Sequence, residues 1–144
     1  MSGLERKLEA LTYLLERVAT AAEEGSPIIV EGKADADALR KLGVKGQVIC
    51  VKASLKPLIE LLEVIKRRDE AIILTDFDRR GAELADLLKK SLEEMRVKPN
   101  LLYWKEIGDL VKRDVKDVEG LASYIDTLSK KARKNGGGSY VPFP

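Results

Sequence analysis

The feature that most constrains the fold is the alternation of short apolar, β-branched runs with longer segments of helical periodicity. Each run is apolar throughout rather than at every second residue, which is typical of strands buried on both faces. The helical segments between them are long enough for the crossovers that parallel strands require. The sequence therefore predicts a three-layer α/β/α fold around a four-stranded parallel sheet. The predicted strands cover residues 27–31, 47–51, 71–75 and 100–104.

Apolar residues spaced three and four positions apart indicate the helices. The first stripe runs from Leu4 to Ala22 and stops near Gly25, with Pro27 beyond it. Ser54 has the character of an N-cap and opens a second amphipathic segment. The other helices are predicted over residues 34–42, around 84–92, and in two pieces between 107 and 134 with a break at 114–117.

The length of 144 residues suits one domain with a substantial core. We expect residues 1–25 to form a helix packed on the domain and residues 26–134 to form the α/β domain with its C-terminal helices. Three consecutive glycines, 136–138, predict a flexible tail over residues 135–144. The heptad-like first helix and this tail are the two segments expected to contact a protein partner or a second copy.

Composition excludes several kinds of active site. The chain has no histidine and one cysteine, so it cannot form serine or cysteine triads, His-based zinc sites or thiolate clusters. A catalytic metal must therefore be bound by oxygen ligands, which favours Mg²⁺, Mn²⁺ or Ca²⁺. No apolar run reaches the roughly 20 residues of a membrane span, and the start does not resemble a secretion signal. We therefore expect a cytoplasmic protein with no membrane partner.

Acidic side chains follow two of the predicted strands. Glu31 comes at the end of the first strand, and Asp76 and Asp78 follow the third. Carboxyl ends of parallel strands meet at one edge of the sheet, and the strand order 2-1-3-4 makes these two strands neighbours. Carboxylates that converge repel one another, and a divalent cation relieves that repulsion. The pattern predicts a Mg²⁺ (or Mn²⁺) site.

Glycines and cations surround these acids. Gly32 and Gly81 would let a phosphate approach the backbone, while Lys33, Arg79 and Arg80 would neutralise its charge. Further backbone contacts are predicted from Lys52 and from the basic segment 130–134.

Several of the candidate site residues are equally compatible with a purely structural role. Asp35 and Asp78 are as well suited to capping helices as to binding metal. The basic segment 130–134 also suits a helix C-terminus, which favours cations. Tyr103 and Trp104 are the only candidates for base stacking, and they are equally compatible with a place in the core.

Two segments together resemble the signatures of the Toprim domain. Residues 29–39 read Ile-Val-Glu-Gly-Lys-Ala-Asp-Ala-Asp-Ala-Leu, and residues 73–81 read Ile-Leu-Thr-Asp-Phe-Asp-Arg-Arg-Gly. The resemblance covers roughly residues 27 to 105. Toprim domains occur in topoisomerases, bacterial primases, recombination-repair proteins, overcoming-lysogenization-defect nucleases and the nuclease that matures 5S ribosomal RNA. The form of the motifs is most similar to the primase and 5S-maturation branches, and the length is similar to that of small stand-alone archaeal primase-like proteins.

The resemblance implies a role for each acidic residue. Glu31 matches the glutamate that acts as general acid or base on the phosphodiester. Asp76 and Asp78 match the Asp-x-Asp pair that holds Mg²⁺, and Asp35 matches a supporting aspartate. The chain has no room for a polymerase lobe, a helicase-binding domain or a topoisomerase tyrosine domain. The implied function is a Mg²⁺-dependent nuclease acting on structured RNA, which is favoured over DNA. The alternative is a non-catalytic adaptor that positions nucleic acid for a partner enzyme.

Overall fold

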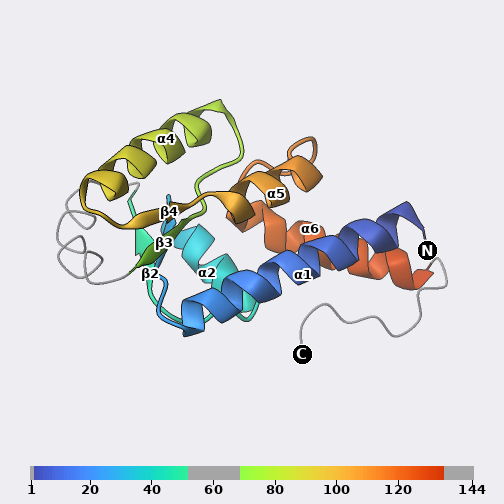
Figure 1. Cartoon of the computed structure of the whole chain (residues 1–144). Coiled ribbons are helices and arrows are strands. Elements are labelled where there is room, and N and C mark those ends of the chain that lie inside the picture. The colour runs from blue at the N-terminus through green and yellow to red at the C-terminus, as the bar shows by residue number, and fades with distance from the viewer. Residues whose placement is uncertain (1, 52–68, 135–144) are drawn as a thin grey trace.

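The computed structural model describes residues 2–51 and 69–134 as alternating helices and strands (Figure 1). The predicted parallel sheet is present, with the predicted strand order β2-β1-β3-β4. In sequence order the elements are α1 (Gly3–Glu23), β1 (Ile28–Val30), α2 (Lys33–Lys41), β2 (Val48–Cys50), β3 (Glu70–Ile73), α4 (Arg79–Glu94), β4 (Lys98–Asn100), α5 (Leu102–Val111) and α6 (Val118–Ala132).

The sheet is parallel throughout, and its central strands are buried on both faces. Ile28 of β1 lies opposite Val48 of β2 on one side and Ile72 of β3 on the other. All three residues of β1 are buried, which explains why its sequence is continuously apolar rather than alternating. The apolar side chains of β1 and β3 are divided between two cores, one on each face of the sheet.

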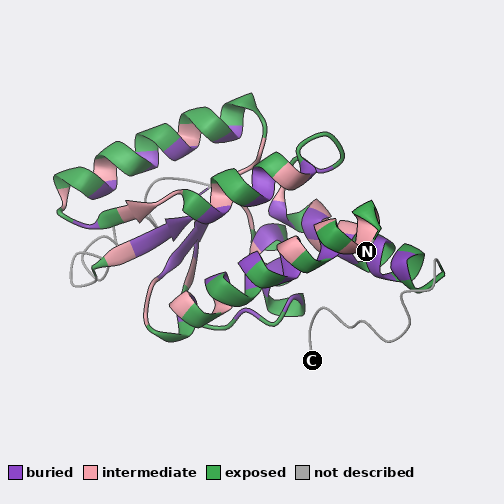
Figure 2. Ribbon diagram, turned by 45° about the vertical axis from the view of Figure 1, so that its right-hand side comes forward, coloured by how far each residue is buried: buried purple, intermediate pink, exposed green. Residues whose placement is uncertain are grey.

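The two faces of the sheet are covered by different helices. Val30 and Leu74 point into the larger core, which is completed by α1, α2, α5 and α6. Ile29 and Ile73 point into the smaller core, where they meet Leu88 and its neighbours on α4. Figure 2 shows the buried strands between these helical layers. The three-layer α/β/α prediction is confirmed.

Helix α1 packs across the C-terminal helices. Its stripe of buried residues includes Leu8, Leu11, Leu15 and Val18, all part of the larger core. The Ser2 side chain caps its start by accepting a hydrogen bond from the Glu5 N–H at 3.1 Å. Gly25, with φ of 109°, follows its end and adopts a conformation that other residues rarely take. The amphipathic stripe read from the sequence is thus used within the chain's own core.

The fourth strand was placed wrongly from the sequence. We predicted a strand over residues 100–104, whereas β4 ends at Asn100 and α5 begins at Leu102. The Asn100 side chain accepts a hydrogen bond from the Leu102 N–H at 2.9 Å, which turns the chain out of the strand. Of the apolar residues that follow, Leu102 is exposed. Tyr103 belongs to the buried face of a helix, on which Tyr103, Ile107 and Val111 recur every four positions.

Three predictions concern residues outside the described part of the chain. The helix expected from Ser54 and the cation Lys52 fall within residues 52–68, and the expected tail lies at residues 135–144. The two-piece C-terminal helical region is confirmed as α5 and α6. Among the described residues, no helix is both long enough and apolar enough to cross a membrane.

Candidate acidic site at the carboxyl edge of the sheet

Glu31 and Asp76 meet where β1 and β3 end side by side. The Glu31 carboxylate (Oε2) accepts a hydrogen bond from the Asp76 backbone N–H at 2.7 Å. The two strands place them there because the Leu74 N–H donates a hydrogen bond to the Ile29 carbonyl at 2.8 Å. β1 and β3 therefore end at the same level of the sheet. The two motifs therefore lie side by side, as predicted, and a hydrogen bond connects them directly.

The Asp76 carboxyl is in a strongly unfavourable environment for a negative charge. Partial burial is the largest cause, and the charge of Glu31 and a hydrogen bond with its side chain add to it. The charges of Asp35 and Asp117 act in the same direction. Together they raise the pKa of Asp76 from 3.8 to about 7. A divalent cation would relieve this crowding, so the chemistry of these donors fits Mg²⁺ or Mn²⁺.

Asp78 is exposed and caps helix α4. Its Oδ1 accepts a hydrogen bond from the Gly81 N–H at 2.8 Å, so the capping role considered for it is present. That leaves Oδ2 as the oxygen available to another ligand. Within residues 2–51 and 69–134, no three acidic or thiol side chains stand close enough to hold a metal ion together as placed. Binding of a metal by Glu31, Asp76 and Asp78 together thus remains a prediction.

Asp35 connects the site to helix α6. Its buried carboxylate accepts one hydrogen bond from the Gly32 N–H at 3.0 Å and another from the Glu119 N–H at 2.9 Å. The first bond holds the turn after Glu31, and the second holds the start of α6. Asp35 therefore holds both the turn after Glu31 and the start of α6, and the supporting role implied by the resemblance stays a prediction. Gly32, at the start of α2, contributes its N–H to this contact.

Gly81 is required by close packing of the chain against itself. A β-carbon added there would lie 1.8 Å from the Asp76 carbonyl oxygen, a distance that no side chain can occupy. The buried Thr75 hydroxyl donates to the Gly81 carbonyl at 2.8 Å and ties the same two segments together. The glycine therefore holds the Asp-x-Asp loop against the start of α4, in addition to any contact with phosphate. Lys33, Arg79 and Arg80 are exposed at the starts of α2 and α4.

Two further residues have roles at the site that the sequence analysis did not predict. The Trp104 indole N–H is shared between the carbonyls of Thr75 (3.0 Å) and Asp76 (3.2 Å), so this side chain braces the acidic loop. Tyr103 is buried, as one of its two interpretations expected. Asp117 caps α6 through a 2.7 Å bond from the Gly120 N–H, and it is close enough to influence Asp76. An aspartate three residues before a glycine at a helix start was the available signal for Asp117.

Comparison with known proteins assigns this chain to a family. The Toprim domain model matches residues 26–103. A UPF0292 protein of Methanocaldococcus jannaschii is 40% identical over 118 residues, covering 82% of this chain and 91% of that protein. A UPF0292 protein of Methanosarcina acetivorans is 34% identical over 127 residues, covering 88% of this chain and 87% of its own length.

A solved structure supports the fold. A protein from Aquifex aeolicus superposes with a TM-score of 0.62 at 23% identity, covering 75% of this chain and 94% of the other. The strand order, the two motif loops at one sheet edge and the matched residues agree with one another. The chain belongs to the Toprim domain family and is similar over most of its length to the small archaeal UPF0292 proteins.

Proposed function

We propose that this protein is a Mg²⁺-dependent nuclease that cleaves phosphodiester bonds in structured RNA. The observation that carries the proposal is the contact between the two motif loops, in which Glu31 accepts the Asp76 N–H beside a carboxyl whose pKa is raised to about 7. Perturbed carboxyl groups gathered at the carboxyl edge of a parallel sheet are typical of functional sites. Membership of the Toprim family supports metal-dependent chemistry on nucleic acid.

The residues have separate tasks in the proposed hydrolysis. When bound, Mg²⁺ supplies charge neutralisation at the scissile phosphate. The Asp76 N–H occupies Oε2 of Glu31, which leaves Oε1 to accept a proton from the attacking water. The water oxygen bonds to phosphorus, the bond from phosphorus to the leaving oxygen breaks, and that oxygen takes up a proton from solvent water. Asp76 and Asp78 provide oxygen ligands, and Asp35 holds the Glu31 turn.

RNA is proposed as the substrate because of the form of the two motifs. Glu31-Gly32 followed by Asp35, paired with Thr75-Asp76-x-Asp78, resembles the primase and 5S-maturation branches of the family. The exposed Lys33, Arg79 and Arg80 stand beside the acids, where they can contact phosphates. Matched RNA and DNA hairpins of the same sequence test this choice, and faster cleavage of the DNA form would reject it.

The test of catalysis uses the purified chain with an end-labelled RNA hairpin and Mg²⁺. We expect Glu31→Gln and Asp76→Asn each to reduce the cleavage rate by roughly 100-fold or more, the scale on which acid–base and metal-ligand groups act. The matched control is Asp86→Asn, which removes an exposed carboxylate paired with Lys90 on α4 and should leave the rate unchanged. Equal rates in all three variants, or no cleavage by the parent protein, would contradict the proposal.

The second candidate function is a non-catalytic adaptor that positions nucleic acid for a partner enzyme. It is favoured by one observation, the engagement of Asp78 in capping while the described residues include no group of three metal donors. This function predicts that the parent protein binds the RNA hairpin and does not cleave it at any concentration of Mg²⁺ or Mn²⁺. Glu31→Gln would then leave binding unchanged.

A further inference from the structure

The loop between α5 and α6 is fastened against the acidic site. The Phe77 N–H, in the middle of the Asp-x-Asp motif, donates to the Lys116 carbonyl at 2.6 Å. Three residues on, the Glu119 N–H donates to Asp35 at 2.9 Å. The Phe77 ring also packs against Gly108 of α5, where an added β-carbon would lie 3.2 Å from it. Residues 112–117 therefore lie directly beside the acidic site and are fixed there by these contacts.

The outer side of this loop is basic. Lys112, Arg113 and Lys116 are all exposed. The loop's own Asp114 is engaged by the Tyr124 hydroxyl at 3.1 Å. Lys112 lies 3.9 Å from Asp109 in an exposed pair, a contact too weak to hold the lysine in place. These cations are therefore available to a ligand that reaches the acidic edge.

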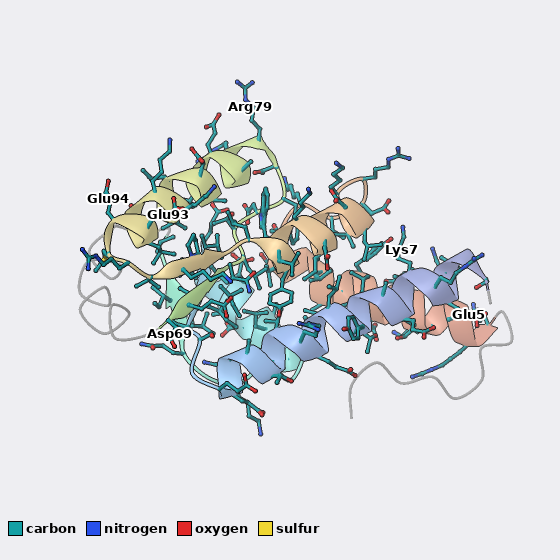
Figure 3. The ribbon with its side chains drawn as sticks, in the orientation of Figure 1. Glu5, Lys7, Asp69, Arg79, Glu93 and Glu94 are labelled. Atoms are coloured by element: carbon teal, nitrogen blue, oxygen red, sulfur yellow. The ribbon has the colours of Figure 1, made fainter. Side chains whose placement is uncertain are left out.

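A second basic group lies at the start of α4, directly after the Asp-x-Asp motif. Arg79 and Arg80 are exposed there, and Arg79 extends away from the body of the protein (Figure 3). Its 3.5 Å pair with Glu83 is almost fully exposed and correspondingly weak. Figures 1 and 2 both show the α5–α6 loop and the start of α4 on the upper side of the molecule. The segment from Asp76 to Asp78 directly precedes Arg79, and Phe77 within it bonds to Lys116, so both groups of cations adjoin the acidic loop.

Two groups of cations next to the acidic loop reduce an electrostatic repulsion that would otherwise oppose nucleic-acid binding. Glu31, Asp76 and Asp117 form a negative centre that repels phosphates. Cations flanking such a centre attract the backbone on either side of the scissile phosphate. We infer that the nucleic-acid backbone crosses the acidic site from Arg79 and Arg80 to the α5–α6 loop, where Arg113 and Lys116 contact its phosphates. The inference rests on the proposed nucleic-acid function and adds the path that the substrate takes.

The basic segment 130–134 is poorly placed for the same task. Helix α6 starts at the site and runs away from it, so Lys131 lies about 20 Å from Asp117 at 1.5 Å per residue. Lys130 is paired with Asp126 at 3.0 Å, and cations in the last turn favour the helix itself. The cations of segment 130–134 are thus better explained by helix stability than by contacts with the nucleic-acid backbone.

A matched pair of double variants tests the inference. Arg113→Ala/Lys116→Ala and Lys130→Ala/Lys131→Ala each remove two positive charges, one pair at the site and the other far from it. Binding of a fluorescent RNA hairpin is measured by anisotropy in Ca²⁺ over a series of salt concentrations. Each phosphate contact contributes about 0.7 to 0.9 to the slope of log K against log salt. We expect the loop variant to lose about 1.5 units of slope and roughly 10- to 100-fold in affinity near 0.1 M salt.

A charge-preserving control and two further outcomes distinguish failure of this inference from failure of the proposed function. The exchange Arg113→Lys/Lys116→Arg keeps both charges and should bind as the parent does, which excludes a folding defect as the cause. Equal losses in the loop and α6 variants, or an unchanged slope in the loop variant, would overturn the inference while leaving the proposed function intact. Failure of the parent protein to bind or cleave RNA and DNA hairpins would overturn both.

Discussion

At neutral pH the Asp76 carboxyl is divided between its protonated and ionised forms, because its pKa is raised from 3.8 to about 7 by burial and by Glu31. Between these two values the folded protein holds a proton that the unfolded chain releases. Stability therefore falls as pH rises through this range and stays at its lower level above it. The penalty applies to the metal-free protein, since a bound cation would compensate the charge.

The free energy of unfolding of Asp76→Asn, compared with that of the parent, measures the cost of ionising Asp76 in the folded protein. In EDTA we expect the variant to match the parent near pH 4 and to exceed it at pH 8 by about 1 kcal/mol, a figure reduced for the partial exposure of the group. Urea unfolding at pH 4, 6 and 8 provides the measurement. Asp86→Asn, in an exposed helical pair, should show no such trend. A gain for Asp76→Asn that did not grow with pH would show that Asp76 is ionised without cost.

Prediction from the sequence succeeded at residues whose position follows from a strand end. Glu31 and Asp76 were expected together because parallel strands end at one edge, and they touch at 2.7 Å. Trp104 and Asp117 reach the same site from α5 and α6, about 30 to 40 residues beyond the motif, and no spacing rule links them to it. Asp78 satisfied both a capping pattern and a ligand pattern, and local sequence does not distinguish the two.

At the scale of elements, a single buried carboxylate links the start of α2 to the start of α6, beside the apolar packing between these helices. Asp35 accepts one bond from the Gly32 N–H and one from the Glu119 N–H. In Asp35→Asn one of the two oxygens becomes an amide donor that faces an N–H, so one contact is lost. We expect a loss of roughly 1–3 kcal/mol in the free energy of unfolding. We also expect a lower cleavage rate, because the Glu31 turn and the start of α6 are released.

Asp37→Asn is the matched control for this change. Asp37 lies two residues further along α2 and is exposed, so its substitution should alter stability by no more than about 0.5 kcal/mol. Denaturant unfolding and hairpin cleavage are measured for both variants. If Asp35→Asn unfolded at the same urea concentration as Asp37→Asn, the proposed bridging role of Asp35 would be rejected.

The fourth strand shows why element boundaries are harder to predict than element types. Residues 100–104 combine apolar and aromatic side chains that suit a strand, but residues 102–104 form the first turn of α5. The outcome is decided by the Asn100 side chain bonding the Leu102 N–H and by burial of Tyr103 with Ile107 and Val111. Pro99 lies in β4 without harm because β4 is an edge strand, where one ladder hydrogen bond is dispensable.

At the scale of the whole molecule, α1 is part of the same core as the helices that support the site. Leu15 is fully buried among side chains from α1, α5 and α6. We expect Leu15→Ala to lower the free energy of unfolding by about 2–5 kcal/mol through lost burial and the cavity left behind. Unfolding should remain a single transition in which the calorimetric and van't Hoff enthalpies agree.

Leu87→Ala is the control for this truncation. Leu87 is 51% exposed on α4, so its loss should cost no more than about 0.5 kcal/mol. Two separate transitions in the parent protein, or a cost for Leu15→Ala as small as that for Leu87→Ala, would show that α1 is only loosely attached to the rest of the protein.

The brace formed by Trp104 also has a spectroscopic consequence. Trp104 is the only tryptophan in the chain, and its indole N–H is bonded to the backbone of the acidic loop. Indole emission depends on hydrogen bonding and on solvent contact at that ring. The tryptophan emission of this protein therefore originates from one ring that contacts the acidic loop, so the unlabelled chain carries an intrinsic optical reporter of events at its own acidic site.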